Sequence, residues 1–418
     1  MAIETPGNRD ELAEIVRRAA RSGHRVRASA SGHSFTDIAL TDGVMVRFDR
    51  LDRTLASDRA SGLVKVEGGA VLGELNRRLD QLGLAFENLG DIDRQTLAGS
   101  ISTGTHGTGT RFGSVSAQVE AIEMVLADGS TFEVSARSDP DALSAARIGL
   151  GALGLIYAVT IRTVPTYTIH RVDNPKPLAE TLERLDELNE ANDHFEFYVF
   201  PHTEVALCRE SRRTDERPRP RSRAAVYAQE VMLENWVGRL FSFAGRTWPS
   251  QGPRLARLAS RNLGGSTKID RSYRVFASER RIRFTEMEYG IPREHAAQAV
   301  RRVLELAARP ELGVGYPIEV RFVAPDDVML SASHERPTCY IAVHQDRRLD
   351  WETYFRAVEA IADEYGGRPH WGKRHFQTAH TLAPRYPRWD EFQRLRAKLD
   401  PDGRFSNAYT DRVLGPVA

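Results

Sequence analysis

Cysteine is nearly absent, since the 418 residues include only Cys208 and Cys339. Two thiols are too few for a disulfide framework or a cysteine-based zinc cluster. Because free thiols are the rule in a reducing compartment, the composition predicts a cytoplasmic protein.

An excess of charge of one sign is also missing. The 58 Lys and Arg residues balance 57 Asp and Glu residues, which leaves a formal net charge of +1. A protein that binds nucleic acid usually carries a basic surplus on one face, so we expect no nucleic-acid partner. The densest basic segment, 209–223, also contains acidic residues and prolines, and we interpret it as a solvated loop.

Long hydrophobic runs are absent as well. No stretch approaches the roughly 20 apolar residues of a membrane helix, so no membrane span is expected. Residues 1–10 are polar and lack the apolar segment of a signal peptide. With 41% hydrophobic and 28% charged residues, the composition is ordinary for a soluble globular protein.

The length predicts two to three domains. Before Pro165, many short expected strands and few helices predict an α+β domain over residues 1–165. Beyond it, strands are expected at 282–287, 318–323 and 339–344, and helices at 293–307 and 351–365. This pattern predicts a second α+β domain with an antiparallel sheet flanked by helices, over 166–366, followed by a C-terminal segment, 367–418.

Gly149, Gly151 and Gly154 match the G-x-G-x-x-G spacing of a dinucleotide-binding turn. Such a turn follows a strand and opens a helix, whose N-terminus faces the pyrophosphate. Here the expected helix, 141–148, precedes the glycines, and the expected strand, 156–161, follows them. Because this order is reversed, we reject a Rossmann interpretation.

Two other glycine-rich segments fit a dinucleotide better. Residues 31–34 read Ser-Gly-His-Ser after an expected strand, and residues 99–109 combine glycines with Ser, Thr and His. Small residues let backbone N–H groups approach a pyrophosphate, and hydroxyls add donors. Either segment alone is more typical of a simple turn, and the pair leaves turn and ligand site as equal alternatives.

The sequence around these segments resembles a known flavoprotein family. Residues 25–34 are similar to the flavin-attachment loop of the vanillyl-alcohol-oxidase-type flavoproteins, and residues 98–109 to their second pyrophosphate loop. Residues 368–373 and 403–409 are similar to signatures of one branch, the sugar-1,4-lactone oxidoreductases and alditol oxidases. The resemblance implies a two-domain α+β flavoprotein, with a para-cresol-methylhydroxylase-type FAD-binding domain and a cap domain.

Within this branch, residues 194–197 and 284–289 resemble actinobacterial L-gulono-1,4-lactone oxidoreductases. The resemblance implies FAD-dependent oxidation of an aldono-1,4-lactone, with O2 or another redox acceptor reoxidising the flavin. The alternative substrate is an alditol. The alternative from a different class is a flavin-binding redox partner or regulator without small-molecule turnover.

The resemblance gives His33 a specific role, because the histidine of the Gly-His-Ser loop bonds covalently to the flavin 8α-methyl carbon in this family. Ala30 departs from the family, which usually has glycine there. The FAD-binding residues that the resemblance implies are Ser29, Ala30, Ser31, Gly32, His33, Ser34, Gly90, Asp91, Thr96, Gly99, Thr103, Gly104, Thr105, His106 and His370.

A candidate catalytic set lies in the second half of the chain. Strand alternation places Glu319 and Arg321 on one face, although an exposed strand face would give the same pattern. The resemblance puts both of them, with Lys373, in the substrate pocket. Negative charge develops on the oxygen of an alcohol as it is oxidised, so we expect Arg321 and Lys373 to stabilise it. Glu319 would hold Arg321 in place, and the neutral imidazole of His344 would accept the proton.

Two neighbouring residues bear on substrate and oxidant. Asp91 stands where alditol oxidases have a substrate-contacting serine, which argues for a substrate other than an open-chain alditol. Gly90 stands where a small residue lets oxygen reach the flavin in this family. We therefore expect an oxidase that produces hydrogen peroxide.

A metal site is not expected. His370, His375 and His380 recur every five residues, whereas zinc sites on helices favour a spacing of three or four. Neither a carboxylate nor a thiolate completes a set nearby, and the resemblance assigns His370 to the flavin.

Overall fold

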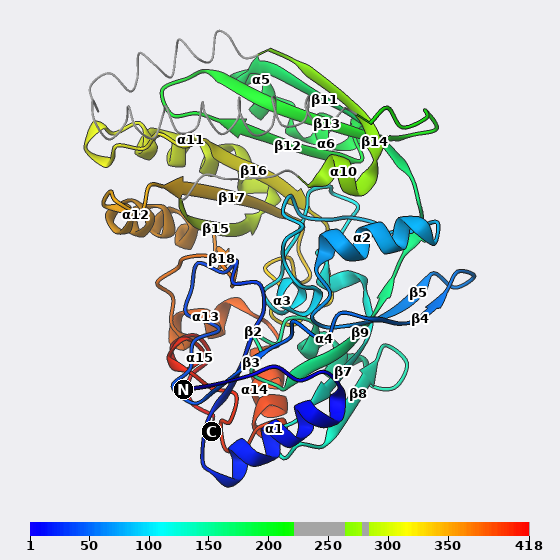
Figure 1. Cartoon of the computed structure of the whole chain (residues 1–418). Helices are drawn as coiled ribbons and strands as arrows, with labels where there is room; N and C mark the ends of the chain where they lie inside the picture. Colours follow the sequence, from blue (N-terminus) through cyan, green and yellow to red (C-terminus); the bar gives the residue numbers. More distant parts are fainter. Residues whose placement is uncertain (221–263, 278–283, 418) are drawn as a thin grey trace.

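The computed structural model describes residues 1–220, 264–277 and 284–417. They form two halves, one built around a large sheet and the other around smaller sheets (Figure 1). The two ends of the chain lie in the same half, where the backbone N–H of Val26 donates to the carbonyl of Arg404 at 2.8 Å. Among the described residues, no helix has the length and apolarity required to cross a membrane.

The first half contains three sheets. A five-stranded antiparallel sheet has the order β4 (Thr54–Asp58), β5 (Leu63–Glu67), β9 (Leu155–Arg162), β7 (Val119–Val125) and β8 (Thr131–Ser135). A parallel sheet joins β1 (Ala2–Glu4), β3 (Val44–Arg47) and β2 (Val26–Ser29), and β10 (Val164–Pro165) pairs with β6 (Leu84–Ala85). The helices of this part are α1 (Arg9–Arg21), α2 (Leu72–Gln81), α3 (Leu97–Ser102) and α4 (Pro140–Arg147).

The second half is one eight-stranded sheet in which every pairing is antiparallel, as predicted. Its order is β14 (Ser266–Arg271), β11 (Thr168–Pro177), β13 (Val205–Thr214), β12 (His194–Val199), β16 (Ile318–Val323), β17 (Thr338–Gln345), β15 (Thr285–Pro292) and β18 (Arg368–Pro369). Its helices are α5 (Leu178–Glu183), α6 (Leu185–Ala191), α10 (Ser272–Phe276), α11 (Ala296–Ala307) and α12 (Trp351–Glu364). The chain ends with α13 (Ala379–Leu382), α14 (Trp389–Leu399) and α15 (Ala408–Leu414).

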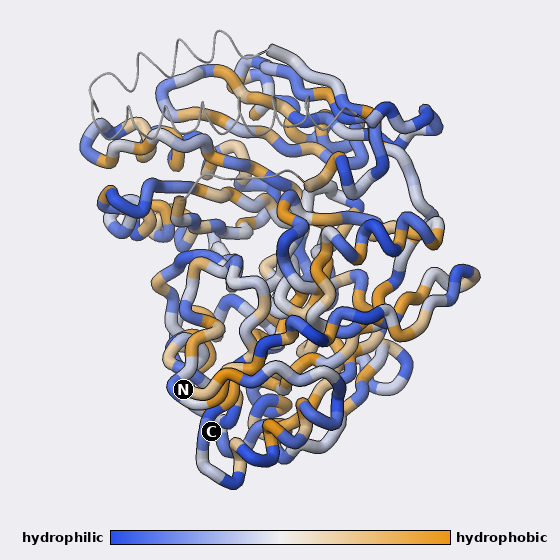
Figure 2. Tube along the Cα trace, viewed as in Figure 1, coloured by the Kyte–Doolittle hydropathy of each residue, from blue (hydrophilic) through white to orange (hydrophobic). Residues whose placement is uncertain are grey.

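Each half has its own hydrophobic core, and Figure 2 shows hydrophobic residues concentrated along the strands. The core of the first half includes C-terminal residues, among them Trp371, Phe392 and Val413. The core of the second half joins its strands to α11 and α12 through residues such as Val300 and Phe355. The domain boundaries at residues 165 and 366 stay a prediction.

The expected loop at 209–223 is wrong for its first part, because residues 205–214 form β13 between β11 and β12. Arg209 does not extend into solvent, since its Nη1 lies 3.2 Å from Glu196 Oε1. Arg212 and Arg213 on the same strand remain exposed. The carboxylate that holds Arg209 lies on a neighbouring strand, so the sequence pattern does not show this contact. Residues 221–223 lie outside the described residues, as does the start of the strand expected from 282. The expected glycine-rich loop from 99 begins instead inside α3.

The rejected Gly149–Gly154 turn has a structural role. It follows α4 and precedes β9, which confirms the reversed order. The buried guanidinium of Arg27 donates to the carbonyls of Leu150 at 2.9 Å and Gly151 at 3.0 Å. It also donates to Phe405 O at 2.6 Å and to Ile38 O. Arg27 therefore joins β2, this turn and the C-terminal segment.

Arg27→Met is expected to lower the free energy of unfolding by about 3 kcal/mol, because it leaves several buried carbonyls without donors. Urea unfolding at a fixed FAD concentration measures this loss. Arg25→Met is the matched control, since Arg25 is exposed and its Nη1 lies 3.4 Å from Asp411. Such a surface pair contributes at most about 1 kcal/mol. Equal losses in the two variants would contradict the structural role of Arg27.

Candidate active site

The loop after β2 lines a cavity of about 310 Å³. α3 and the 150–154 turn complete the wall. Gly32 has a φ of +70° and open space where a side chain would stand, so the loop turns without narrowing the cavity. The predicted residues that line this cavity are Ser29, Ala30, Ser31, Gly32, His33, Ser34, Thr96, Gly99 and Thr103.

The donors along this loop fit a pyrophosphate. Among the described residues, none accepts a hydrogen bond from the backbone N–H groups of residues 31–34. A Cβ on Gly99 would lie 2.9 Å from the Cβ of Ala30, so glycine lets the two segments approach. A row of unpaired N–H groups beside small residues is the usual setting for phosphate oxygens.

A second cavity, of about 60 Å³, adjoins the first. His33, Ser34, Gln95 and Thr103 line both cavities, so His33 lies where they meet. Burial lowers the pKa of His33, which keeps its imidazole neutral near pH 7. The other predicted residues that line the second cavity are Gly90, Asp91, Thr105, His106, Glu319, Arg321, His370 and Lys373.

Two predicted residues line neither cavity. Gly104 follows α3 with a φ of +75°, and a Cβ on it would meet Ile148 Cδ1 at 3.1 Å. Its positive φ is one that glycine adopts readily, so the residue suits the turn after α3. His344 on β17 is 5% exposed and lies behind Glu286, with its Nε2 atom 3.4 Å from Glu286 Oε1.

Arg321 on β16 is surrounded by carboxylates. Its Nη2 lies 3.2 Å from Asp91 and contacts Glu319, and its Nε donates to Glu196 at 2.9 Å. The hydroxyl of Tyr198 donates to Glu319 at 2.7 Å. Burial opposes the charge of Arg321, but these carboxylates raise its pKa well above the ordinary value. The guanidinium is therefore charged and fixed in orientation.

Lys373 joins two carboxylates of β15. Its Nζ donates to Glu286 Oε1 at 2.5 Å and lies 2.7 Å from Glu288 Oε2. Burial opposes its charge, but the two carboxylates raise the pKa of Lys373 above its ordinary value. Burial likewise opposes the charge of Glu286, whose pKa is lowered to about 2, mainly by Lys373. All three groups are therefore charged at neutral pH.

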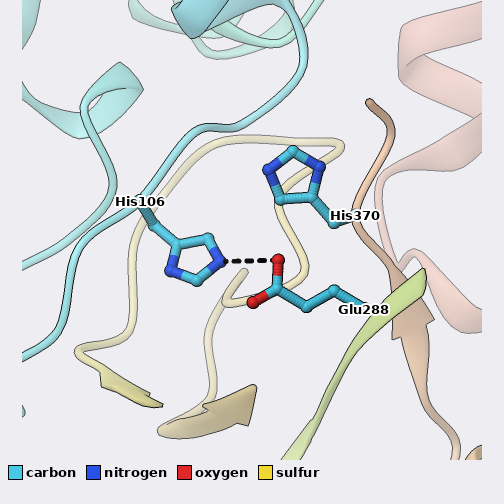
Figure 3. Close-up of side chains that lie close together, drawn as sticks. All are labelled: His106, Glu288 and His370. Atoms are coloured by element: carbon cyan, nitrogen blue, oxygen red, sulfur yellow. Dashed lines mark ion pairs between the residues drawn. The ribbon is translucent and has the colours of Figure 1, made fainter. Parts of the chain in front are cut away.

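His106, Glu288 and His370 come together (Figure 3), and Glu288 is the same carboxylate that Lys373 contacts. His106 Nε2 lies 3.4 Å from Glu288 Oε2, and burial lowers the pKa of His370 to about 3. The three groups are close enough to hold a metal ion, as are Glu286, Glu319 and His344. Lys373 Nζ, however, already contacts the Glu288 oxygen that faces His106, and the Glu286 oxygen that faces His344. The ammonium thus supplies the cation, and we assign no metal here.

The second cavity is lined by more carboxylates than cations. Arg321 and Lys373 are its two cations, and its four carboxylates are Asp91, Glu286, Glu288 and Glu319. The carboxylates that hold Arg321 come from three segments of the chain, and those that hold Lys373 both come from β15. The sequence reasoning did not include Glu196, Glu286 or Glu288 in the site. The Glu-Met-Glu alternation on an expected strand was the available signal, because it places both carboxylates on one face.

The five-residue histidine spacing does not form a cluster. His375 is buried and its Nε2 lies 3.0 Å from the hydroxyl of Tyr409, while His380 is exposed. His370 alone of the three lines the second cavity.

Comparisons with known proteins agree with this architecture. Residues 1–135 match the family model "FAD binding domain", and residues 159–413 match "D-arabinono-1,4-lactone oxidase". The chain is 52% identical to an L-gulono-1,4-lactone dehydrogenase of Mycobacterium tuberculosis, over 99% of this chain and 96% of the relative. It is 33% identical to the L-gulonolactone oxidase of Mus musculus, over 98% and 94%. It is 32% identical to an alditol oxidase of a Streptomyces species, over 99% and 95%.

The fold has solved counterparts. The crystal structure of cholesterol oxidase from B. sterolicum superimposes with a TM-score of 0.83, covering 99% of this chain and 94% of that one at 16% identity. This likeness concerns the fold alone, and it agrees with the predicted α+β fold. The chain belongs to the D-arabinono-1,4-lactone oxidase family of vanillyl-alcohol-oxidase-type FAD flavoproteins.

Proposed function

We propose that this protein uses FAD to oxidise a sugar-derived alcohol, an aldono-1,4-lactone of the L-gulono-1,4-lactone type. The names of its relatives support this substrate class. The observation that carries the proposal is the position of two oriented cations, Arg321 and Lys373, in a cavity that meets the FAD-binding loop at His33. Bound FAD would supply the oxidant, accepting the hydride that leaves the carbinol carbon.

The chain's own residues bind and polarise the alcohol. Arg321 and Lys373 donate hydrogen bonds to the substrate oxygen as negative charge develops there. Glu319 and Asp91 hold the guanidinium of Arg321, so it does not need to reorganise during the reaction. His344 is the proposed final proton acceptor, although it does not line the cavity.

An alditol is the second candidate substrate, because an alditol oxidase is among the relatives. Asp91 favours a lactone, since its carboxylate is committed to Arg321 and replaces the serine hydroxyl that contacts alditols in this family. A cytoplasmic location and the absence of a nucleic-acid partner belong to the same proposal, as do domains over 1–165 and 166–366 with the segment 367–418.

Anaerobic flavin bleaching tests the proposed function. The purified holoenzyme is mixed without oxygen with L-gulono-1,4-lactone, other aldonolactones, xylitol or sorbitol, and the flavin absorbance is followed. Bleaching by a lactone at lower concentration than by any alditol supports the proposal. Preferential bleaching by alditols supports the second candidate. A flavin that none of them reduces identifies a redox partner without small-molecule turnover.

Gly90→Ala is expected to slow reoxidation of the reduced flavin by O2 several-fold and to reduce hydrogen peroxide formation accordingly. A Cβ there would lie 3.2 Å from the carbonyl of His106 and 3.2 Å from Thr105 Cγ2, so the methyl fits after a small shift and occupies space in the cavity wall. Stopped-flow mixing of the reduced enzyme with O2 measures the rate, and anaerobic reduction by the substrate is the control. Unchanged O2 reactivity would contradict the gating role of Gly90.

A further inference from the structure

One ring nitrogen of His344 is hydrogen-bonded, and the other has no hydrogen-bond partner among the described residues. Its Nδ1 lies 3.2 Å from the carbonyl of Pro317, so Nδ1 carries the hydrogen and donates it. Its Nε2 is buried and has no hydrogen-bond partner among the described residues. The 3.4 Å between Nε2 and Glu286 Oε1 exceeds a normal N–H···O distance. Nε2 can therefore accept one proton and then donate a hydrogen bond to Glu286 Oε1.

Lys373 divides its ammonium between two carboxylates. Its Nζ contacts Glu286 Oε1 and Glu288 Oε2, so neither carboxylate has this cation to itself.

The positions of Glu286 and His344 relative to the cavity indicate the direction in which a proton would move. Glu286 and Lys373 line the second cavity, and His344 does not. The same oxygen, Glu286 Oε1, contacts Lys373 Nζ at 2.5 Å and His344 Nε2 at 3.4 Å. A proton that reaches Glu286 from the cavity therefore has His344 as its next acceptor. Because Lys373 holds the pKa of Glu286 at about 2, this carboxylate is a poor final acceptor.

We propose that Glu286 relays the hydroxyl proton of the substrate from the cavity to Nε2 of His344, while Lys373 holds the oxygen that loses it. The relay rests on the proposed function. The O–H bond of the alcohol breaks, and an N–H bond forms at His344 Nε2. The carbinol C–H bond breaks with its electron pair, which leaves as hydride to the flavin oxidant, and the product is the carbonyl compound.

His106 and Glu288 form a second histidine–carboxylate pair with similar contacts, but this histidine lies in the cavity itself. His106 Nδ1 lies 2.9 Å from the carbonyl of Gly107, and its Nε2 lies 3.4 Å from Glu288 Oε2. His106 itself lines the cavity and stacks on Tyr340 with ring centroids 3.7 Å apart. A proton held there would stay beside the reacting oxygen. Glu288 is therefore a matched control for Glu286, with the same strand, residue type and lysine partner.

Among the described residues, two carboxylates approach the ring of His344. Glu286 on β15 and Glu319 on β16 are the carboxylates whose oxygens lie within 4.8 Å of its ring nitrogen. Glu319 is already engaged by Arg321 and by the hydroxyl of Tyr198. Glu286 has Lys373 as its cationic partner, and it faces the nitrogen of His344 that has no hydrogen-bond partner. Glu286 is therefore the carboxylate better placed to pass a proton to His344.

Pre-steady-state reduction of the holoenzyme by its best lactone or alditol, measured across pH, tests the relay. Glu286→Gln and His344→Asn are expected to slow flavin reduction about 10²-fold or more. Both variants are expected to change the pH profile of the reduction rate, because each removes one group of the relay. His344→Asn keeps an amide donor for the Pro317 carbonyl, so it removes mainly the acceptor nitrogen. Glu288→Gln is expected to keep the wild-type pH profile, whatever its effect on the maximal rate.

A readout independent of turnover is the nitrogen NMR spectrum of holoenzyme labelled with ¹⁵N-histidine, assigned with His344→Asn. At pH 8 the expected state of His344 is the tautomer with hydrogen on Nδ1 and a lone pair on Nε2. The opposite tautomer, or a Glu286→Gln variant with the wild-type rate and pH profile, would overturn the relay alone. Failure of every lactone and alditol to reduce the wild-type flavin would overturn both the relay and the proposed function.

Discussion

Lys373→Met is expected to lower kcat/KM for the lactone about 10³-fold, because a fixed cation is removed from the oxygen on which charge develops. Lys373 is the ammonium of the second cavity, and the two carboxylates beside it keep it charged. Without it, Glu286 and Glu288 face each other unbalanced, and their pKa values are expected to rise until at least one takes up a proton. The variant therefore loses its cation and gains a neutral carboxyl group in the same place.

Steady-state kinetics measure this effect, and FAD content and thermal unfolding show whether the variant is folded. Lys398→Met, at an exposed position on α14, is the control and should keep wild-type kinetics. A folded, FAD-loaded Lys373→Met enzyme within about tenfold of the wild-type kcat/KM would contradict the assignment, since one removed donor of this kind ordinarily costs at least about 10²-fold.

His33→Ala is expected to abolish covalently bound flavin. Among the described residues that line the larger cavity, His33 is the only histidine, and that lining contains neither Cys nor Tyr. Burial lowers the pKa of His33, so its ring nitrogen is free to form a bond. An imidazole bonded to the flavin withdraws electrons, so its loss should also lower the reduction potential of the cofactor and slow its reduction.

Flavin fluorescence of the protein band on a denaturing gel, and the colour of an acid precipitate, measure the covalent bond. His106→Ala tests the alternative histidine, because His106 lines the smaller cavity, and it should keep the bond. If acid releases all the flavin of the wild-type protein, the covalent link is absent. If His33→Ala keeps fluorescent protein, another residue carries it.

Local sequence was informative where a few consecutive residues set the geometry. The Ser-Gly-His-Ser loop requires a glycine at positive φ after a strand, and the structure has both. Alternation along 318–323 correctly put Glu319 and Arg321 on one face, because side chains on a strand alternate whatever packs against them. The sequence also correctly predicted that a helix precedes the Gly149–Gly154 turn and a strand follows it.

Contacts between residues far apart in the chain could not be predicted from the sequence. The basic residues at 209–214 were expected in a loop, but they lie on β13, where Arg209 pairs with Glu196 of β12. Gly104 was expected to contact the cofactor, and it is absent from the lining of both cavities, so that role stays a prediction. His344 looked like a pocket residue, since its strand face was correct, yet Glu286 on the neighbouring strand lies in front of it.

The sequence by itself determined the α+β fold with an antiparallel sheet, and its resemblance to a family determined the FAD-dependent class. Strand alternation and family motifs are local properties of the chain, so they are visible before folding. Only the tertiary structure decided that Lys373 lies between Glu286 and Glu288, and that Arg321 contacts carboxylates from three separate segments. Such contacts join residues far apart in the chain, and their effect on charge depends on the distances and burial that folding creates.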